Sequence, residues 1–220
     1  MISGEIVEDR YIVLGAGGHA KIALDILKKQ GKFIYGLTDA SIPKGETCMG
    51  YPVIGDDTEL PFLLKKGICN AVMGIGHVGY PKVRNSVYKQ TLEIGFSFPN
   101  LIHPTAVIAD TVEMGKGSLF AAQCVVNADA KIGTLCIVNT LAVIEHEVNI
   151  GDGVHIAPHA TVLGQASVGQ NSFIGAGSIV LQGVHVGKNC IIGAGSVVLH
   201  DIEDNCIMVG NPARLLRRRK

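Results

Sequence analysis

The sequence has no tryptophan, no CxxC pair and no apolar run long enough to cross a membrane. Its six cysteines are spread from position 48 to position 206, without the close spacing of a zinc site or a disulfide framework. No stretch of about 18 apolar residues occurs, and no charged segment followed by an apolar run marks a signal peptide at the N-terminus. These absences predict a cytoplasmic protein with reduced thiols.

Neither sign of charge dominates, because 19 Lys and Arg residues face 19 Asp and Glu residues. No overall field therefore favours nucleic acid or a membrane surface. The one basic run, residues 217–220, fits a solvated, frayed terminus or a contact with a phosphorylated ligand. Apolar residues make up 47% of the 220 residues, which is enough for one large domain or two small ones.

A six-residue repeat runs through residues 101–202. Divided into sixes from Leu101, this stretch gives seventeen blocks without an insertion. The second position of every block is apolar, and it is Ile or Val in fifteen of the seventeen. The sixth position is small or Val in every block but the last. A fixed β-branched position of this kind is typical of short strands with one face buried.

A slower repeat of eighteen residues consists of Gly115, Gly133, Gly151, Gly169 and Gly187. Three sixes per eighteen predict three flat sides per coil, and therefore an all-β, triangular parallel β-solenoid of between five and six coils. We expect these glycines at the corners, where glycine tolerates a positive φ.

Residues 1–100 lack the repeat and predict a small α/β domain, comparable to half of a Rossmann fold. Strands are expected at 11–14, 33–39 and 71–76, with an amphipathic helix after the first that ends near Gly31. The expected organisation is therefore an α/β domain over 1–100, the solenoid over 101–202, and a closing segment with a basic tail over 203–220.

The turn Gly15–Ala20 fits the pattern G-x-G-x-x-A, and Asp39 follows the first glycine by twenty-four residues. In dinucleotide-binding enzymes such glycines admit a pyrophosphate to a helix N-terminus, while the acid binds a ribose hydroxyl. A domain of this length has room for one nucleotide rather than two. The alternative is a tight strand–helix turn without a ligand.

Residues 143–159 contain three histidines and three carboxylates. With eighteen residues per coil, His146 lies between Ala128 and Gly164 on the adjacent coils, and these small residues leave space over its imidazole. His155 follows half a coil later and projects from another side of the solenoid. The two histidines can serve one site only between subunits.

Three interpretations of these histidines remain: a metal site, an acid–base pair and ordinary surface polarity. Zinc ligands stacked on one face should differ by eighteen or thirty-six positions, and no two of the eight histidines do, which disfavours a zinc hydratase. Histidine titrates near neutrality and can act as a general base, with a carboxylate fixing its tautomer. Glu145 and Glu147 flank His146, and their positions alone do not select one of them.

The segments "VNTLAVIEHEVNIGDGVHIAP" (residues 138–158) and "LGAGGHAK" (residues 14–21) resemble the hexapeptide-repeat sugar acetyltransferases of bacterial glycan pathways. That family includes N-acetyltransferases of UDP-4-amino-4,6-dideoxy sugars and proteins similar to sialic acid O-acetyltransferases. "MVGNPARLL" (residues 208–216) resembles the segment that closes many such enzymes. The resemblance implies a left-handed β-helix, a homotrimer with active sites between subunits, and acetyl-CoA as co-substrate without a metal.

The same resemblance implies an acetyl-CoA-dependent N-acetyltransferase acting on the 4-amino group of a nucleotide-linked 4-amino-4,6-dideoxy sugar. His146 matches the general base and Glu147 the carboxylate that polarises it. Acetyl-CoA is expected along His155, Gly164, Ala176 and Ala194. The nucleotide-linked sugar is expected at Gly17, Gly18, His19, Asp39, Gly76 and Asn139.

Two departures from the family pattern concern the acceptor. His159 stands where relatives often carry glycine, and either narrows the acceptor pocket or faces solvent. Thr38 and Asp39 replace two acids. The alternatives are an O-acetyltransferase with a hydroxyl acceptor, and a non-catalytic scaffold that binds a nucleotide sugar.

Overall fold

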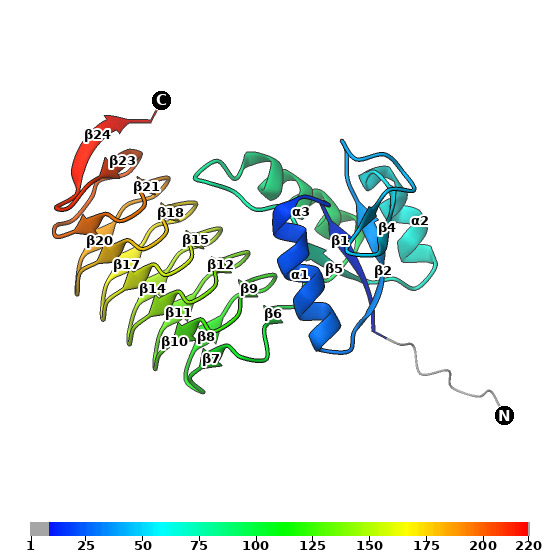
Figure 1. Cartoon of the computed structure of the whole chain (residues 1–220), viewed down its shortest axis with the longest axis horizontal. Helices are drawn as coiled ribbons and strands as arrows, with labels where there is room; N and C mark the ends of the chain where they lie inside the picture. The colour runs from blue at the N-terminus through cyan, green and yellow to red at the C-terminus, as the bar shows by residue number, and fades with distance from the viewer. Residues whose placement is uncertain (1–8, 220) are drawn as a thin grey trace. The chain divides into compact units, whose positions relative to one another are not determined.

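The computed structural model describes residues 9–219, which divide into two compact units (Figure 1). The N-terminal unit contains residues 9–76 and 83–99. The prism unit contains residues 77–82 and 100–219, so a short segment from the first hundred residues belongs to it. Among the described residues, no helix is long and apolar enough to span a membrane.

The N-terminal unit is a five-stranded sheet with the order β3-β4-β2-β1-β5. Strands β4, β2, β1 and β5 are parallel, and β3 is antiparallel to β4. The elements are β1 (Arg10–Leu14), α1 (Gly18–Lys29), β2 (Phe33–Thr38), β3 (Thr47–Cys48), β4 (Tyr51–Gly55), a 3-10 turn (Asp57–Glu59), α2 (Leu60–Lys65), β5 (Asn70–Met73) and α3 (Lys82–Ile94). The predicted parallel α/β sheet is confirmed.

Apolar periodicity explains how the first strand and helix pack. Strand β1 buries Ile12, Val13 and Leu14 completely, and α1 buries one stripe that includes Leu24 and Leu27. The strand expected over 71–76 is shorter, since β5 ends at Met73. Gly74 then passes so close to the end of β1 that a Cβ there would lie 2.9 Å from the Leu14 carbonyl oxygen.

The prism unit is the predicted three-sided left-handed β-helix, built from strands of two residues each. They are β6 (Leu101–Ile102), β7 (Val107–Ile108), β8 (Glu113–Met114), β9 (Leu119–Phe120), β10 (Val125–Val126), β11 (Lys131–Ile132), β12 (Ile137–Val138), β13 (Val143–Ile144), β14 (Asn149–Ile150), β15 (His155–Ile156), β16 (Thr161–Val162), β17 (Ser167–Val168), β18 (Phe173–Ile174), β19 (Ile179–Val180), β20 (His185–Val186), β21 (Ile191–Ile192) and β22 (Val197–Val198). Each strand pairs in parallel with the strand eighteen residues away, as Val125 pairs with Val143 and Val143 with Thr161.

Three sheets form the sides of the prism, and each is named here by its first strand. The β6 face contains β6, β9, β12, β15, β18 and β21; the β7 face contains β7, β10, β13, β16, β19 and β22; the β8 face contains β8, β11, β14, β17 and β20. The second residue of nearly every strand points inward and is buried in one continuous apolar core. The predicted inward position is therefore confirmed for the blocks of the core, whereas Met114, at the same position of its block, is 37% exposed.

The glycines that recur every eighteen residues do not have positive φ, contrary to our expectation. Positive φ falls instead on the fifth position of the block, where Glu147 has 59° and Gln165 has 61°. The recurring glycines lie against the next coil: a Cβ on Gly169 would be 2.6 Å from the carbonyl carbon of Gly187. Close approach of two backbones, rather than left-handed geometry, requires glycine at these positions.

The C-terminal segment extends the β6 face. Strand β23 (Cys206–Val209) pairs in parallel with β21, and β24 (Arg214–Arg218) pairs antiparallel with β23. The reading of the basic tail as a frayed terminus is therefore wrong as far as residue 219; Lys220 lies outside the described residues. Arg218 pairs with Glu203, and Arg219 donates to the Asn189 carbonyl (2.6 Å) and lies over the Tyr80 ring.

The two kinds of glycine should respond differently to substitution. Gly169→Ala should destabilise the protein by about 2 kcal/mol, because its Cβ would meet backbone atoms that cannot move away. Gly195→Asn should cost less than about 1 kcal/mol, because Gly195 has φ of 67°, open space around it, and asparagine tolerates this conformation. Urea unfolding followed by circular dichroism would measure both, and equal losses would contradict this distinction.

Candidate active site

His146 lies at the corner between the β7 and β8 faces, two residues after the end of β13. Its imidazole fills the space beneath Gly164 of the next coil, where a Cβ on that glycine would be only 2.6 Å from Nε2. The small residue expected one coil above His146 is therefore needed for the ring to lie there. About half of the His146 side chain remains exposed, so the ring is held at a surface rather than in the core.

Glu147, not Glu145, is the carboxylate partner of His146. The distance from His146 Nδ1 to Glu147 Oε2 is 3.1 Å, whereas Glu145 Oε2 accepts a hydrogen bond from Asn127 at 2.9 Å. A hydrogen bond from Gln165 and then the one with His146 hold the pKa of Glu147 below its ordinary value. The carboxylate is therefore ionised at neutral pH and can accept a proton-bearing Nδ1.

His155 lies on the β6 face and is only 8% exposed; the rings of His77 and Phe173, in the same unit, pack against its own. Its Nδ1 donates to the carbonyl oxygen of His77 at 2.7 Å. Its Nε2 is 3.2 Å from Asn139 Nδ2, while Asn139 Oδ1 accepts from the Thr140 amide. With the Nδ1 hydrogen directed to the His77 carbonyl oxygen and Asn139 Oδ1 already engaged, the Asn139 Nδ2 group faces Nε2 as a donor.

Apart from His155, the candidate acetyl-CoA residues fall at two edges of the β7 face. Gly164 shares a corner with His146. Ala176 and Ala194 lie one coil apart at the opposite edge, where the chain passes from the β6 face to the β7 face. A single prism therefore does not bring these residues together. His159 lies at this second edge and is exposed.

In the N-terminal unit, the predicted residues follow the carboxyl ends of three adjacent parallel strands: Asp39 follows β2, the Gly17–His19 turn follows β1, and Gly76 follows β5. Strand β2 lies on one side of β1 and β5 lies on the other, so the strand order reverses between β1 and β5. Ligands of parallel α/β sheets usually bind beside such a point, at the carboxyl ends of the strands. A Cβ on Gly17 or Gly18 would have no atom within 4 Å, whereas one on Gly76 would be 3.2 Å from the His19 ring. Gly17 and Gly18 thus leave open space at the start of α1, and His19 packs beside Gly76.

Asp39 supports the glycine-rich turn. Its Oδ2 accepts from the Ala16 amide at 2.7 Å, and its Oδ1 accepts from the amides of Ser41 and Ile42. Burial favours a higher pKa, but these backbone hydrogen bonds outweigh it and lower the pKa of Asp39. Thr38 is fully buried and donates to Asp57 at 2.6 Å, so its side chain serves the internal packing of this unit.

The cysteines of the repeat belong to the core of the prism. Cys124, Cys136 and Cys190 are completely buried at the sixth block position, as the repeat predicts. Burial raises the pKa of Cys124 to about 12, so this thiol is a poor nucleophile. Among residues 9–219, no three His, Cys, Asp or Glu side chains are grouped closely enough to hold a metal ion.

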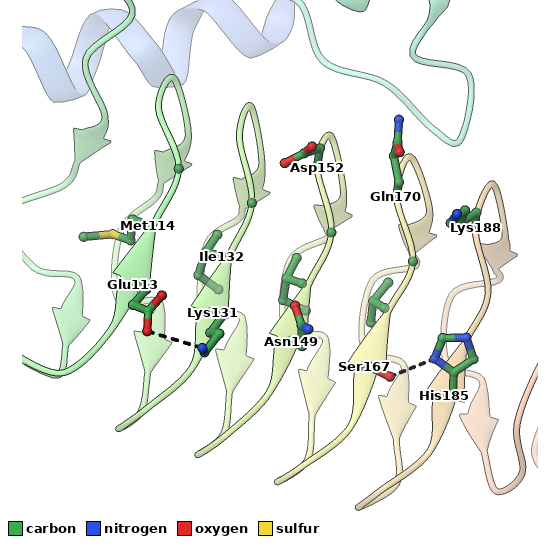
Figure 2. Close-up of a pocket in the computed structure, with 16 residues that line it drawn as sticks. Glu113, Met114, Lys131, Ile132, Asn149, Asp152, Ser167, Gln170, His185 and Lys188 are labelled. Carbon is green, nitrogen blue, oxygen red and sulfur yellow. Dashed lines mark hydrogen bonds and ion pairs between the residues drawn. The ribbon is translucent and has the colours of Figure 1, made fainter.

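A separate groove of about 620 Å³ runs along the β8 face (Figure 2). The outward side chains of its strands are polar: Glu113 pairs with Lys131 at 3.4 Å, and Ser167 is 2.8 Å from His185 Nδ1. None of the residues predicted from the sequence as site residues lines this groove. Its ladder of polar side chains suits a face in contact with water.

Two residues that were not predicted from the sequence contact the predicted site. Gln165 donates to Glu147 Oε2 at 3.1 Å, and the offset of eighteen from Glu147 could have indicated it. His77 contacts His155 from a segment seventy-eight positions earlier. The repeat could not predict that contact, because His77 lies outside it.

Comparison with known proteins gives matches over both units. The family model described as the PglD N-terminal domain matches residues 10–91, and the hexapeptide repeat of succinyl-transferase matches residues 165–200. GDP-perosamine N-acetyltransferase of Escherichia coli O157:H7 is 27% identical over 155 residues, covering 68% of each chain.

Two solved structures are similar over nearly the whole chain. A mutant perosamine N-acetyltransferase from Caulobacter crescentus, in complex with CoA and GDP-perosamine, is 35% identical with a TM-score of 0.89, covering 93% of this chain and 95% of that one. The acetyltransferase domain of PglB from Neisseria gonorrhoeae, in complex with acetyl coenzyme A, is 31% identical with a TM-score of 0.86, covering 95% and 100%.

The role of Asp39 in holding the turn predicts a pH dependence. Because its pKa is lowered on folding, its contribution to stability is present above the ordinary value of 3.8 and is lost as pH falls through the folded value. Asp39→Asn should therefore lower hydrogen-exchange protection of the Ala16 and Ile42 amides by about tenfold at neutral pH, and by less in acid. Asp25→Asn, on the exposed face of α1, is the control. Equal effects of both variants would contradict this role.

Proposed function

The chain belongs to the hexapeptide-repeat sugar N-acetyltransferase family, and we propose that it transfers the acetyl group of acetyl-CoA to the 4-amino group of a nucleotide-linked 4-amino-4,6-dideoxy sugar. The observation that carries this proposal is the contact between His146 Nδ1 and Glu147 Oε2. Because Glu147 engages Nδ1, the other ring nitrogen of the exposed His146, Nε2, can accept a proton from the substrate. We also propose a cytoplasmic location and a role in bacterial glycan biosynthesis.

His146 acts as the general base in this proposal. Glu147 accepts the Nδ1 hydrogen, so Nε2 is unprotonated and can take a proton from the sugar amine as its nitrogen attacks the thioester carbonyl carbon. The carbon–sulfur bond then breaks, CoA leaves as a thiol after protonation, and the amide remains on the sugar. No covalent acetyl-enzyme is required, which agrees with the burial of Cys124 and its neighbours in the repeat.

His155 has a supporting role rather than that of a hydrogen-bond donor to the thioester oxygen. Its Nε2 accepts from Asn139 in the described geometry, so a backbone N–H is the better candidate for stabilising the developing oxyanion. We propose that His155 and Asn139 form the wall of the site beside the reacting groups. Ala176 and Ala194 would line the pantetheine arm at the next corner of the prism.

The N-terminal unit would bind the nucleotide part of the acceptor. The open space at Gly17 and Gly18 lets phosphate oxygens approach the backbone N–H groups at the start of α1, where the helix dipole favours negative charge. His19 and Gly76 lie next to this turn. Asp39 would act through the turn that it holds, rather than as a free carboxylate.

The proposed assembly is a homotrimer, supported by the character of the β7 face. Its outward row is nearly all apolar, with Val107 63% and Ile179 37% exposed, whereas the same row on the β8 face is polar. Exposed apolar rows of this kind mark association surfaces. Three β7 faces packed around a threefold axis would bring the His146 corner of one copy beside the Ala176 and Ala194 corner of the next.

The first test of the activity is release of free thiol from acetyl-CoA with a panel of GDP- and UDP-linked 4-amino-4,6-dideoxy sugars. His146→Ala should lower kcat by about 100-fold or more, and Glu147→Gln by about tenfold, because the base and its orientation are lost. Glu145→Gln and His159→Ala should stay within about threefold of wild type.

The alternatives make different predictions in the same assay. Turnover only on hydroxyl acceptors would replace the proposal with O-acetylation. Binding of nucleotide sugar without turnover on any acceptor would replace it with a scaffold function.

The proposed trimer predicts complementation between two inactive variants. His146→Ala removes the base at one edge of the β7 face, and Ala194→Glu should block the pantetheine arm at the other. Coexpressed in equal amounts, they should recover about a quarter of wild-type turnover, since one site in four would combine two intact edges. No recovery from mixed trimers would contradict a site shared between copies.

Ile179→Lys should also reduce the trimer to monomers by light scattering, while Asn149→Lys, at the outward position of the β8 face, should leave the trimer intact. A monomeric wild-type protein would contradict the assembly directly.

A further inference from the structure

The Glu147 carboxylate is held by two coils at once. One of its oxygens, Oε2, lies 3.1 Å from His146 Nδ1 on its own coil and 3.1 Å from Gln165 Nε2 on the next coil. We propose that Gln165 is a positioning residue of the transfer reaction, which holds the Glu147 carboxylate in the orientation that faces the His146 ring. This inference rests on the proposed function, in which His146 is the base.

The backbone of the prism sets the contact between Gln165 and Glu147. Both residues occupy the fifth position of their blocks, eighteen residues apart, and both have left-handed φ, 61° and 59°. Their side chains therefore leave the corner in parallel, one coil above the other. The backbone N–H of Gln165 also donates to the backbone carbonyl oxygen of His146 at 3.0 Å, so the same residue holds the backbone of the proposed base.

The exposure of the pair explains why a second donor is needed. The His146 and Glu147 side chains are 51% and 52% exposed. Such a pair is normally weak and mobile, because water competes for both partners and each side chain loses freedom on pairing. A donor fixed by the next coil limits the orientations of the carboxylate. Catalysis needs that limit, since small errors in orientation cost large factors in rate.

Two adjacent residues of the next coil have complementary effects on the base. Gly164 leaves the space that the imidazole occupies, and Gln165 supplies the hydrogen bond to its carboxylate partner. Two other carboxylates lie near this corner. Glu145 accepts a hydrogen bond from Asn127, and Asp129 lies one coil below Glu147 at the same block position. Gln165 therefore places a neutral donor, rather than a third carboxylate, on the coil that follows Asp129 and Glu147.

The test compares pH profiles of kcat for wild type, Gln165→Met and Gln165→Glu. Methionine keeps the length of the side chain but removes the donor, so kcat should fall about tenfold, with KM for acetyl-CoA within about twofold. In Gln165→Met, loss of the donor raises the pKa of Glu147. In Gln165→Glu, the added negative charge also favours the protonated form of the His146–Glu147 pair. The acid limb should therefore move to higher pH by about 0.5 unit in Gln165→Met and about 1 unit in Gln165→Glu.

Asn189→Leu is the matched control. Asn189 also occupies a fifth block position and donates to a side chain on the following turn, Asn205, at 3.2 Å, but at the corner between the β8 and β6 faces. Removing that bond should leave kcat and the pH profile unchanged, even where the stability cost equals that of Gln165→Met. A general weakening of the prism would affect all three variants alike.

Each outcome decides between the hypotheses. Wild-type turnover with unchanged pH limbs in both Gln165 variants would overturn the inference and leave the proposed function standing. An equal fall in kcat in all variants without a shift of the acid limb would assign Gln165 to packing only. Absence of turnover by wild type on every acceptor would instead reject the proposed function. An acid limb of kcat that lies at the highest pH in Gln165→Glu, at a lower pH in Gln165→Met and at the lowest in wild type would support the positioning role.

Discussion

The parallel pairing of each strand with the strand eighteen residues away governs the geometry of the prism. Neighbouring strands lie roughly 4.8 Å apart in such a ladder, so each side chain at a corner stands directly over the residue eighteen positions earlier. His146 can occupy its place only because Gly164 follows at that offset, and Gln165 reaches Glu147 for the same reason. The chemistry of this corner is therefore set by repeat spacing, and a one-residue shift in register between the two coils would move Gly164 and Gln165 away from His146 and Glu147.

The repeat made the prism predictable because its signal is physical: one inward apolar residue per block and one close backbone approach per coil. The corner glycines were misread because two different constraints select glycine. Positive φ is tolerated in this prism by residues other than glycine, such as Glu147 and Gln165. Backbone contact between coils, in contrast, excludes any Cβ. A sequence shows the residue type that both constraints select, and only the coordinates distinguish the two.

The candidate site was predictable residue by residue only where a contact follows the repeat. His146 and Gly164 obey the eighteen-residue offset, so their proximity could be inferred. The choice of Glu147 over Glu145 depends on left-handed φ at position 147, which turns that side chain towards the imidazole. The cover over His155 comes from His77, a residue outside the repeat, and no periodicity carries information about it.

A rigid prism is well suited to a site divided between copies. In the proposed trimer, the base at one edge of the β7 face must meet the acetyl donor held at the opposite edge of a neighbouring prism, and both edges must keep their positions. Corner residues of the prism are fixed by backbone hydrogen bonds to the coils on each side, as the Gln165 amide is to His146 and the Glu147 amide to Ala128. Loops would need separate supports to hold two half-sites to within the fraction of an ångström that transfer requires. The repeat supplies that support at every coil, which leaves the few side chains at the corner free to differ in chemistry.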